Sequence, residues 1–362
     1  MWIWYVSRSD GGDPAAIAAQ ARLAGIKTLV IKSGDGASYW SQFSRSLVRA
    51  LHAGGVNVCA WQYVYGSNPI AEAVVGARAV SDGADCLVVD AEAEYEGRYA
   101  AAQTYIDALR AAVGRDYPVG LASFPYVDYH PSFPYSVFLG HGGAQFNLPQ
   151  MYWREIGTSV EAVYQHTYTY NRIYRRPIRP LGQTEDGASG SEIALFRGLS
   201  VRYHAGGLSW WDFAWASANG LWSSLSGLYT SVSSIASLGF PLLGYGSAGD
   251  MVLWMQELLA SAIPAQRTTG IFASETLADL RSFQARHRIP ATGETGPLTW
   301  RALLRLPAVR VRWVAADVRS ARSARAIGGG GSLSRIAAAP ESATLHALAY
   351  EIHKPQGTDG SR

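Results

Sequence analysis

The sequence contains few cysteines and few charged residues. Two of its 362 residues are cysteines, and 16% are charged. Two cysteines cannot build the disulfide framework of a small secreted scaffold, so the fold must rest on a hydrophobic core. The hydrophobic content of 48% is enough for a large core, and the length favours two domains.

Cys59 and Cys86 both lie in apolar runs that are typical of buried strands. Free thiols are the expected state for such residues. A disulfide is the alternative, and it requires that the two strands be neighbours.

Long apolar runs and a secretory signal are also lacking. No run is long enough to span a bilayer. Residues 1–6 are typical of a strand and carry no basic segment of the kind that opens a signal peptide. We therefore expect no transmembrane segment and no export by a signal peptide.

The charge and histidine patterns exclude further classes. The net charge is +3, and residues 306–362 alone carry +4, so the remainder is near −1. That is too neutral for a nucleic-acid-binding protein. The eight histidines include no H-E-x-x-H and no close pair, and no G-x-G-x-x-G follows the first apolar run. We expect no metal and no cofactor.

Eight short apolar runs alternate with helical stretches over the first 220 residues. Their starts are roughly 25–35 residues apart, the size of one strand–helix unit. The runs cover residues 2–6, 28–32, 56–63, 85–90, 119–124, 145–152, 178–182 and 207–211. Helical stretches include residues 14–24, 41–53, 70–81, 98–113, 160–172 and 191–204. This alternation predicts an α/β fold, a (β/α)8 TIM barrel rather than an open sheet.

Residues 231–248 carry Ser, Gly and Pro and predict a linker. We assign residues 1–230 to the barrel and residues 249–305 to a small all-α three-helix domain. Residues 306–362 are expected to form a basic, flexible tail that is solvated, with contact to anionic wall polymers or a membrane as the alternative.

Residues 249–305 contain two similar turn-and-helix units. The pattern Thr-Gly-x-x-x-x-x-Thr occurs at residues 269–276 and again at residues 292–299. With the preceding helix, this pattern resembles the peptidoglycan-binding domain of the three-helix type that is found on bacterial cell-wall enzymes. The resemblance implies that peptidoglycan glycan strands are the partner of this chain.

In a (β/α)8 barrel, catalytic groups come from the carboxyl ends of the strands. The fourth run ends in Asp90, which Glu92 and Glu94 follow. Side chains alternate along a strand, so these three carboxylates are expected on one face, with consecutive Cα atoms about 6.6 Å apart. Their repulsion should leave one of them protonated near neutral pH, as a general acid must be. A solvated acidic loop is the alternative interpretation.

Other strand ends carry side chains that suit a sugar, because aromatic faces pack on pyranose rings and amides bind hydroxyls. Tyr152 is the candidate that assists the carboxylates. Only one of the adjacent Trp210 and Trp211 can point into the barrel, and Trp2 and Trp4 are expected to serve packing. The candidates for substrate contacts are Trp61, Gln62, Tyr63, Gln150, Glu185, Trp210, Trp211 and Asp212.

Asp90-x-Glu92-x-Glu94 resembles the Asp-x-Asp-x-Glu motif of family 18 glycoside hydrolases, which are chitinases and endo-N-acetylglucosaminidases. This resemblance implies that Glu94 is the acid and that Glu92 orients the 2-acetamido group of the substrate, which attacks as nucleophile. Gln150-Met151-Tyr152 is similar to the Met-x-Tyr-Asp segment of that family, with Trp153 in place of the Asp.

Asp90-x-Glu92 also resembles the Asp-x-Glu motif of family 25 lysozymes, which are muramidases on the same barrel. This second resemblance implies that Glu92 is the acid. That family usually has an Asp near the end of its first strand, where this chain has Trp4-Tyr5-Val6-Ser7.

Together these patterns predict a hydrolase that cuts the glycosidic bonds of peptidoglycan by carboxylate acid/base catalysis and is targeted by its C-terminal domain. It is expected to act at the bacterial cell wall after lysis or non-classical export. The alternative is a non-catalytic wall-binding protein, for example part of a phage tail or injection device.

Overall fold

The computed structural model describes residues 1–313. Most of the basic tail predicted at residues 306–362 lies outside the described residues. The prediction that this tail is flexible also concerns residues outside the described part. In the part that is described, no helix is both long enough and apolar enough to cross a bilayer.

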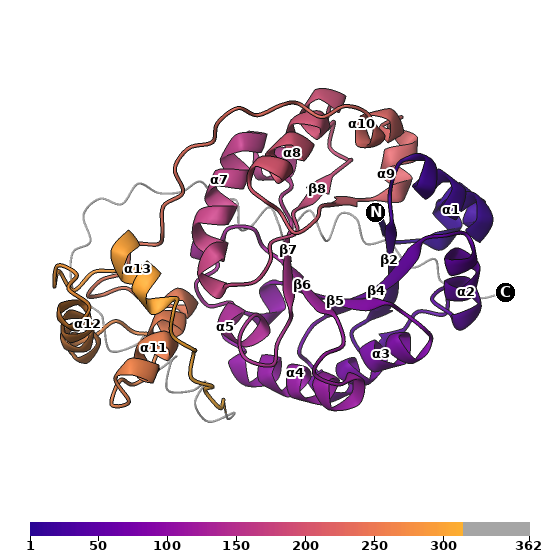
Figure 1. Cartoon of the computed structure of the whole chain (residues 1–362). Helices are drawn as coiled ribbons and strands as arrows, with labels where there is room; N and C mark the ends of the chain where they lie inside the picture. The colour runs from indigo at the N-terminus through magenta and orange to yellow at the C-terminus, as the bar shows by residue number, and fades with distance from the viewer. Residues whose placement is uncertain (314–362) are drawn as a thin grey trace. The chain divides into compact units, whose positions relative to one another are not determined.

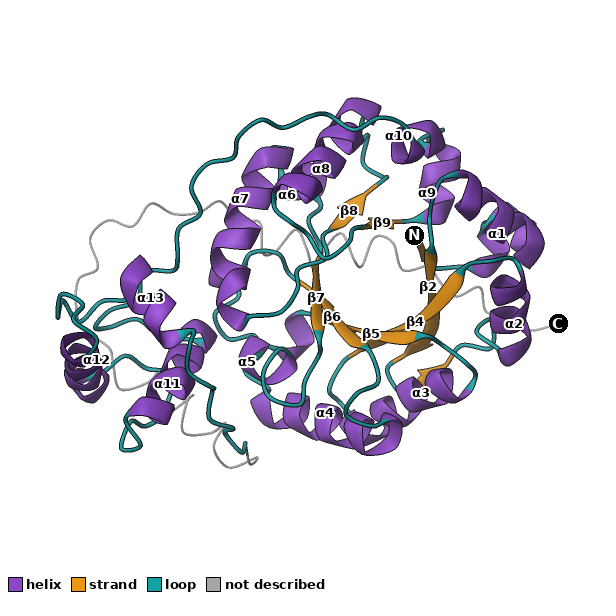
Figure 2. Cartoon of the chain, in the orientation of Figure 1, coloured by secondary structure: helices purple, strands orange, loops and turns teal. Residues whose placement is uncertain are grey.

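Eight parallel strands form a barrel in residues 1–211 (Figure 1, Figure 2). They are β1 Trp2–Ile3, β2 Thr28–Asp35, β4 Asn57–Val64, β5 Cys86–Ala91, β6 Val119–Ser123, β7 Phe146–Pro149, β8 Leu181–Gln183 and β9 Ser209–Trp211. One sheet runs in the order β1-β2-β4-β5-β6-β7, and β8 pairs with β9. A parallel bridge between Gln150 and Leu181 joins β7 to β8, and Trp2 Nε1 donates to Ser209 Oγ (3.0 Å) between β1 and β9. The predicted (β/α)8 fold is confirmed.

Helices lie around the outside of the strands (Figure 2). They are α1 Pro14–Leu23, α2 Arg45–Ala53, α3 Pro69–Ser81, α4 Tyr99–Val113, α5 Tyr135–Phe138, α6 Trp153–Ile156, α7 Val160–Asn171, α8 Gly190–Arg202, α9 Phe213–Ala218 and α10 Trp222–Ser226. Local capping explains several starts: Asp13 caps α1, and Ser189 forms a capping box with Glu192 at α8. The segment after β6 forms only the short α5, because Pro131 and Pro134 interrupt a helix there.

Alternation along the strands separates a barrel interior from an outer core. On β4, Val58, Ala60 and Val64 belong to the hydrophobic core between the sheet and the helices. Trp61 points the other way, since its ring contacts those of Trp2 and Trp211. Residues two apart on each strand share a face, so each strand contributes a set of interior side chains that continues toward its carboxyl end.

Cys59 and Cys86 form a disulfide, so the expectation of free thiols is wrong. The two residues are direct partners in the β4–β5 register, with Cα atoms 4.5 Å apart. The disulfide was the alternative prediction, and it required that the two strands be neighbours, as they are. By alternation the bridge lies on the interior face of β4 and β5, on the same face as Tyr63 and Asp90 nearer the carboxyl ends.

Three helices follow a segment without regular structure: α11 Asp250–Ala262, α12 Ser274–Arg286 and α13 Pro297–Leu303. Val252, Leu258, Leu280, Phe283 and Trp300 are buried and belong to the hydrophobic core. The second fold element, a small all-α domain, is therefore present as predicted.

The repeated Thr-Gly pattern has a structural role in the described fold. Gln256 Oε1 accepts hydrogen bonds from the amides of Thr269 (2.9 Å) and Gly270 (2.8 Å), and its Nε2 donates to Thr276 Oγ1 (3.0 Å). The second unit repeats this arrangement one helix later. There Gln284 accepts from the Gly293 amide (2.9 Å) and donates to Thr299 Oγ1 (3.0 Å). The glutamine of each helix thus holds the turn that leads into the next helix.

Candidate active site

Asp90, the last inward residue of β5, meets Glu92 at the carboxyl end of the barrel. Gln150, just after β7, donates from one Nε2 to both carboxylates, at 3.0 Å to Asp90 Oδ1 and 2.9 Å to Glu92 Oε1. Asp90 is buried, with 6% of its surface exposed, whereas Glu92 is half-buried. The amide therefore holds two carboxylates side by side, and of this pair Glu92 is the more accessible.

The buried position of Asp90 raises the pKa of its carboxyl group. Burial, followed by the negative charge of Glu92, raises the pKa of Asp90 well above its ordinary value, and the nearby Lys32 opposes this shift. Two coupled carboxylates titrate as a pair, so the Asp90–Glu92 pair retains a proton at a pH at which isolated carboxylates are ionised. A proton shared at a barrel mouth is what a general acid requires.

Glu94 reaches the same region from a turn and not from the strand. The pairing of β5 ends at Ala91 on the β4 side and at Asp90 on the β6 side, so the chain has no partner beyond this point and turns at Ala93–Tyr95. The expectation that the three carboxylates lie on one strand face is therefore wrong, because only Asp90 is on the strand, Glu92 directly follows it and Glu94 is in the turn. Its carboxylate nevertheless accepts a hydrogen bond from Tyr63 Oη (2.8 Å).

Tyr63 connects the three acids. Burial and then the charges of Glu92, Glu94 and Asp90 raise its pKa, so the hydroxyl lies close to all three and stays protonated. Its ring contacts the ring of Tyr65 with centroids 5.0 Å apart. The hydroxyl of Tyr65 donates to Asp35 Oδ1 (2.7 Å), so polar and ring contacts together connect the acids with β2.

Lys32 is a buried cation on β2 whose function the sequence pattern did not predict. Its Nζ donates to Asp35 Oδ2 (2.8 Å), and only 1% of the residue is exposed. It lies over the rings of Trp61 (4.5 Å) and Trp40 (4.7 Å). The sequence feature that could have identified Lys32 as a site residue is its place directly after the apolar run Leu29-Val30-Ile31.

Tryptophans from three strands and a loop fill the interior below and beside these groups. Trp211 contacts Trp2 (5.8 Å), Trp4 (5.7 Å) and Trp61 (5.5 Å), measured between ring centroids. Trp2 and Trp61 are buried and serve packing, whereas Trp4 and Trp211 are half-buried and therefore reachable. Trp4 is stacked on Tyr5 with centroids 5.5 Å apart, so a pair of aromatic rings lies just after β1.

Tyr152 lies near Asp90 and Glu92 on one side and near Glu185 on another. Burial, followed by the charges of Glu185 and Asp90, raises the pKa of Tyr152 well above its ordinary value. Burial, followed by the charges of Asp186 and Asp212, raises the pKa of Glu185 to about 8. Tyr152 is therefore a neutral hydrogen-bond donor between two acidic groups that come from different strands.

Three of the predicted substrate contacts are engaged by other parts of the fold. The amide of Gln62 is fully buried and donates to the carbonyls of Gly36 and Glu72 (2.8 Å each). The ring of Trp210 packs on Phe196 of α8, with centroids 5.1 Å apart. These corrections follow from alternation, because the neighbours Trp61, Tyr63 and Trp211 occupy the interior face.

Asp212 is the third of these side chains. It caps α9 by accepting from the Trp215 amide (3.1 Å), and it also accepts from the backbone amides of Ala214 and Trp4. These bonds tie the end of β9 to the end of β1, and only 4% of Asp212 is exposed. Asp212 therefore helps to close the barrel.

The groups that do converge are carboxylates, hydroxyls and one amide, with aromatic rings beside them. Among residues 1–313, no group of three or more His, Cys, Asp or Glu side chains is arranged to hold a metal ion. The arrangement offers a buried carboxyl group with a raised pKa, a more accessible carboxylate beside it and aromatic rings. This combination suits proton transfer to a sugar oxygen.

Residues 248–303 match the model of the peptidoglycan binding domain family. The match covers the three helices and both Thr-Gly units. No curated protein matches the chain.

Several solved structures share features of the barrel. An endo-1,4-beta-D-mannanase from Thermotoga petrophila is 9% identical, with 58% of this chain and 86% of that chain covered and a TM-score of 0.45. The catalytic domain of a chitinase from Pyrococcus furiosus is 14% identical, with 63% and 96% covered and a TM-score of 0.44. The catalytic domain of endolysin ply40 from bacteriophage P40 of Listeria monocytogenes is 20% identical, with 31% and 60% covered and a TM-score of 0.26. Scores this low do not inform on activity.

Proposed function

We propose that this protein is a glycoside hydrolase that cuts the glycan strands of peptidoglycan, and that residues 248–303 attach it to the wall. The observation that carries the proposal is the Asp90–Glu92 pair, which shares one amide donor and retains a proton at the mouth of the barrel. The match of residues 248–303 to a peptidoglycan binding domain supports the choice of substrate.

Within the pair, Glu92 is the proton donor in this proposal. Asp90 is too buried to touch a substrate, and Gln150 holds its carboxyl group beside that of Glu92. Glu92 is half-buried and is the group that a glycosidic oxygen can reach. This assignment matches the role that the resemblance to family 25 lysozymes implies.

The other groups would bind and orient the sugar. Glu94, held by Tyr63, is the candidate for stabilising positive charge that develops on the sugar ring. Tyr152 and Glu185 would bind hydroxyls on the other side of the acid pair, and Trp4 and Trp211 would support a pyranose face. No step in this scheme requires a metal ion.

The proposal is tested by digestion of purified, dye-labelled sacculi. Wild type is expected to release soluble dye, and Glu92→Gln is expected to lose at least about 100-fold in rate, as is typical for removal of a general acid. Glu161→Gln, an exposed position on α7, is the matched control and should keep the wild-type rate. Equal rates for Glu92→Gln and wild type would refute the assignment.

A non-catalytic wall-binding protein is the second candidate, and one observation favours it. The end of β1 carries the stacked Trp4–Tyr5 pair and no carboxylate at these positions. An aromatic surface binds sugars without cutting them. Wild type that sediments with sacculi but releases no dye would favour this second candidate.

A further inference from the structure

The segment between β5 and α4, residues 92–98, carries both Glu92 and Glu94, and we call it the acid loop. Its far end is held by a second segment at residues 130–132. Glu96 accepts from His130 Nδ1 (2.8 Å) and from Ser132 Oγ (3.0 Å), and the Gly97 amide donates to the Ser132 carbonyl (2.8 Å). The His130 ring is stacked on Phe124 at 3.5 Å, which fixes this support in place.

The peptidoglycan-binding-like domain contacts that supporting segment at its middle residue. The Asp250 amide, at the start of α11, donates to the Pro131 carbonyl (2.7 Å). Gly249 packs so closely that an added Cβ would lie 2.6 Å from the same oxygen, and its φ of +110° favours glycine as well. The glycine that opens α11 is therefore required for this close approach.

The side chain of Asp250 makes a second set of contacts with the barrel. Its carboxylate is fully buried and accepts from the Ser136 amide (2.9 Å), Ser136 Oγ (2.6 Å) and Tyr174 Oη (2.7 Å). Tyr99 also donates a side-chain hydrogen bond to it. Tyr99 is the first residue of α4, so it directly follows the acid loop.

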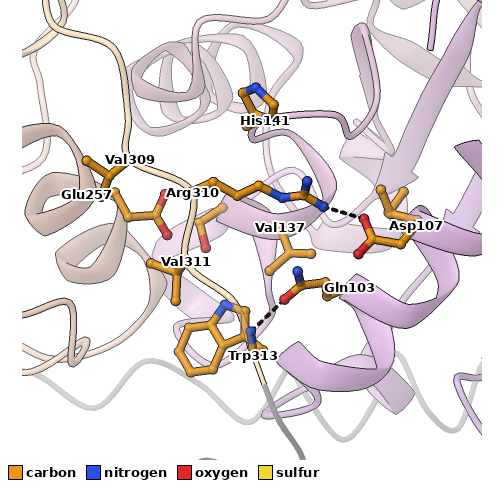
Figure 3. Close-up of a pocket in the computed structure, with 11 residues that line it drawn as sticks. Gln103, Asp107, Val137, His141, Glu257, Val309, Arg310, Val311 and Trp313 are labelled. Carbon is orange, nitrogen blue, oxygen red and sulfur yellow. Dashed lines mark hydrogen bonds and ion pairs between the residues drawn. The ribbon is translucent and has the colours of Figure 1, made fainter. Parts of the chain in front are cut away.

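The chain beyond α13 returns to the same place. Trp313 packs its ring on Tyr99 with centroids 4.6 Å apart, and its amide donates to Gln103 Oε1 (2.6 Å) on α4. Figure 3 shows Trp313 beside Gln103, and Arg310 paired with Asp107. Tyr99 is thus held from two sides by residues that follow the barrel in sequence.

We propose that Asp250 is a positioning residue for the acid loop, so that the C-terminal domain contributes to catalysis itself and not only to attachment. The inference rests on the proposed function. Asp250 contacts the support directly at Pro131, and Tyr99 is the one residue between Asp250 and the acid loop. If these contacts are lost, Glu92 and Glu94 are less well placed relative to Gln150 and Tyr63, while the substrate-contacting side chains remain.

The first arm of the test measures order in the acid loop without any substrate. Amide hydrogen exchange is followed in the full chain for wild type, Asp250→Asn and Tyr99→Phe. The control is Asp279→Asn, a half-buried position on α12. We expect exchange across residues 92–98 to quicken about fivefold in the first two variants, the effect of losing one hydrogen bond, with β2 and β4 unchanged. Tyr99→Phe removes a single hydroxyl, so it keeps the test valid if Asp250→Asn does not fold.

The second arm measures turnover of a soluble tetrasaccharide of alternating N-acetylglucosamine and N-acetylmuramic acid, for which attachment to a wall gives no advantage. We expect kcat to fall about tenfold in Asp250→Asn and Tyr99→Phe with KM within twofold of wild type, because misplacement of an acid affects the chemical step. Asp279→Asn should retain wild-type kcat.

The two arms of the test distinguish a failure of this inference from a failure of the proposed function. Unchanged exchange in the acid loop overturns the inference whatever the activity is. Faster exchange with unchanged kcat also overturns it, because the acid loop then needs no support for catalysis. A wild type that cleaves neither the tetrasaccharide nor sacculi refutes the proposed function instead, and the exchange data still show whether Asp250 orders the loop.

Discussion

The environment of Glu185 predicts how the stability of the folded protein depends on pH. Its folded-state pKa of about 8 lies above the ordinary value of 4.5. The folded state therefore holds a proton that the unfolded state releases, so stability should fall as pH rises from about 4.5 to about 8.

Glu185→Gln should remove this dependence. The variant stays neutral, so it should match wild type near pH 4.5 and be more stable above pH 8 by a few kcal/mol at most, since one pKa unit corresponds to about 1.4 kcal/mol. Thermal unfolding at several pH values measures this difference. Glu161→Gln, which is exposed, should follow wild type at every pH. A constant difference between Glu185→Gln and wild type would contradict the assigned cause.

Glu92 and Glu94 should differ in their contribution to rate. Gln150 holds Glu92 beside the buried Asp90, whereas Glu94 contacts Tyr63. We expect Glu94→Gln to lose about tenfold in kcat and Glu92→Gln at least about 100-fold, because only the second removes the proton donor. Steady-state kinetics on soluble glycan give both values. A larger loss for Glu94→Gln would shift the acid to the position that the family 18 resemblance implies.

At the residue scale, the sequence identified Asp90, Glu92 and Glu94 because acids that directly follow an apolar run are visible without a structure. It could not tell which face of a strand is interior, so Gln62 and Trp210 were assigned to the mouth along with their inward neighbours. The sequence alone assigns no role to Lys32, because its contact with Trp61 joins two different strands.

The elements of the C-terminal domain depend on the two glutamines that hold its turns. Gln256→Leu leaves the amides of Thr269 and Gly270 without this acceptor, and Gln284→Leu does the same for Gly293. The Gly293 amide is buried, and a buried amide left unpaired costs about 1–3 kcal/mol, so Gln284→Leu should destabilise the domain by about this amount. The Thr269 and Gly270 amides are only partly buried, and Gln256→Leu should also destabilise the domain. Urea unfolding followed by circular dichroism measures both. Gln165→Leu, exposed on α7, is the control and should change little, and equal stability of all three would contradict this role.

The disulfide joins two neighbouring elements, β4 and β5. It closes a loop of 27 residues, for which about 3–4 kcal/mol of stabilisation is expected. A reductant should therefore lower the Tm of wild type, and a Cys59→Ala/Cys86→Ala variant should unfold at the lower temperature with or without reductant. Two free thiols in unreduced, denatured protein would refute the bridge.

At the element scale, the alternation of apolar runs and helical stretches was sufficient to predict the barrel. The ends of strands were harder, because a strand ends where its partners end. β5 stops at Ala91 for that reason, and the turn at Ala93–Tyr95 follows from pairing that no local pattern encodes. The small antiparallel strand β3, Ser38–Tyr39, was missed for the same reason.

At the scale of the whole molecule, the contacts of Asp250 with Ser136 and Tyr174 predict that the barrel and the C-terminal domain unfold together. Calorimetry of wild type should show one transition. Asp250→Asn should separate it into two, because a buried carboxylate with several donors holds the contact together, while Asp279→Asn should keep one. Two transitions in wild type would contradict this coupling.

The central claim is that the barrel cuts wall glycan with Glu92 as its proton donor. The most direct test is to incubate purified sacculi with wild type and with Glu92→Gln, and to analyse the released fragments by mass spectrometry before and after borohydride reduction. We predict fragments with reducing N-acetylmuramic acid from wild type and almost none from Glu92→Gln. Reducing N-acetylglucosamine would show a glucosaminidase instead. No fragments from wild type that remains bound to the sacculi would contradict the claim and indicate a non-catalytic wall-binding protein.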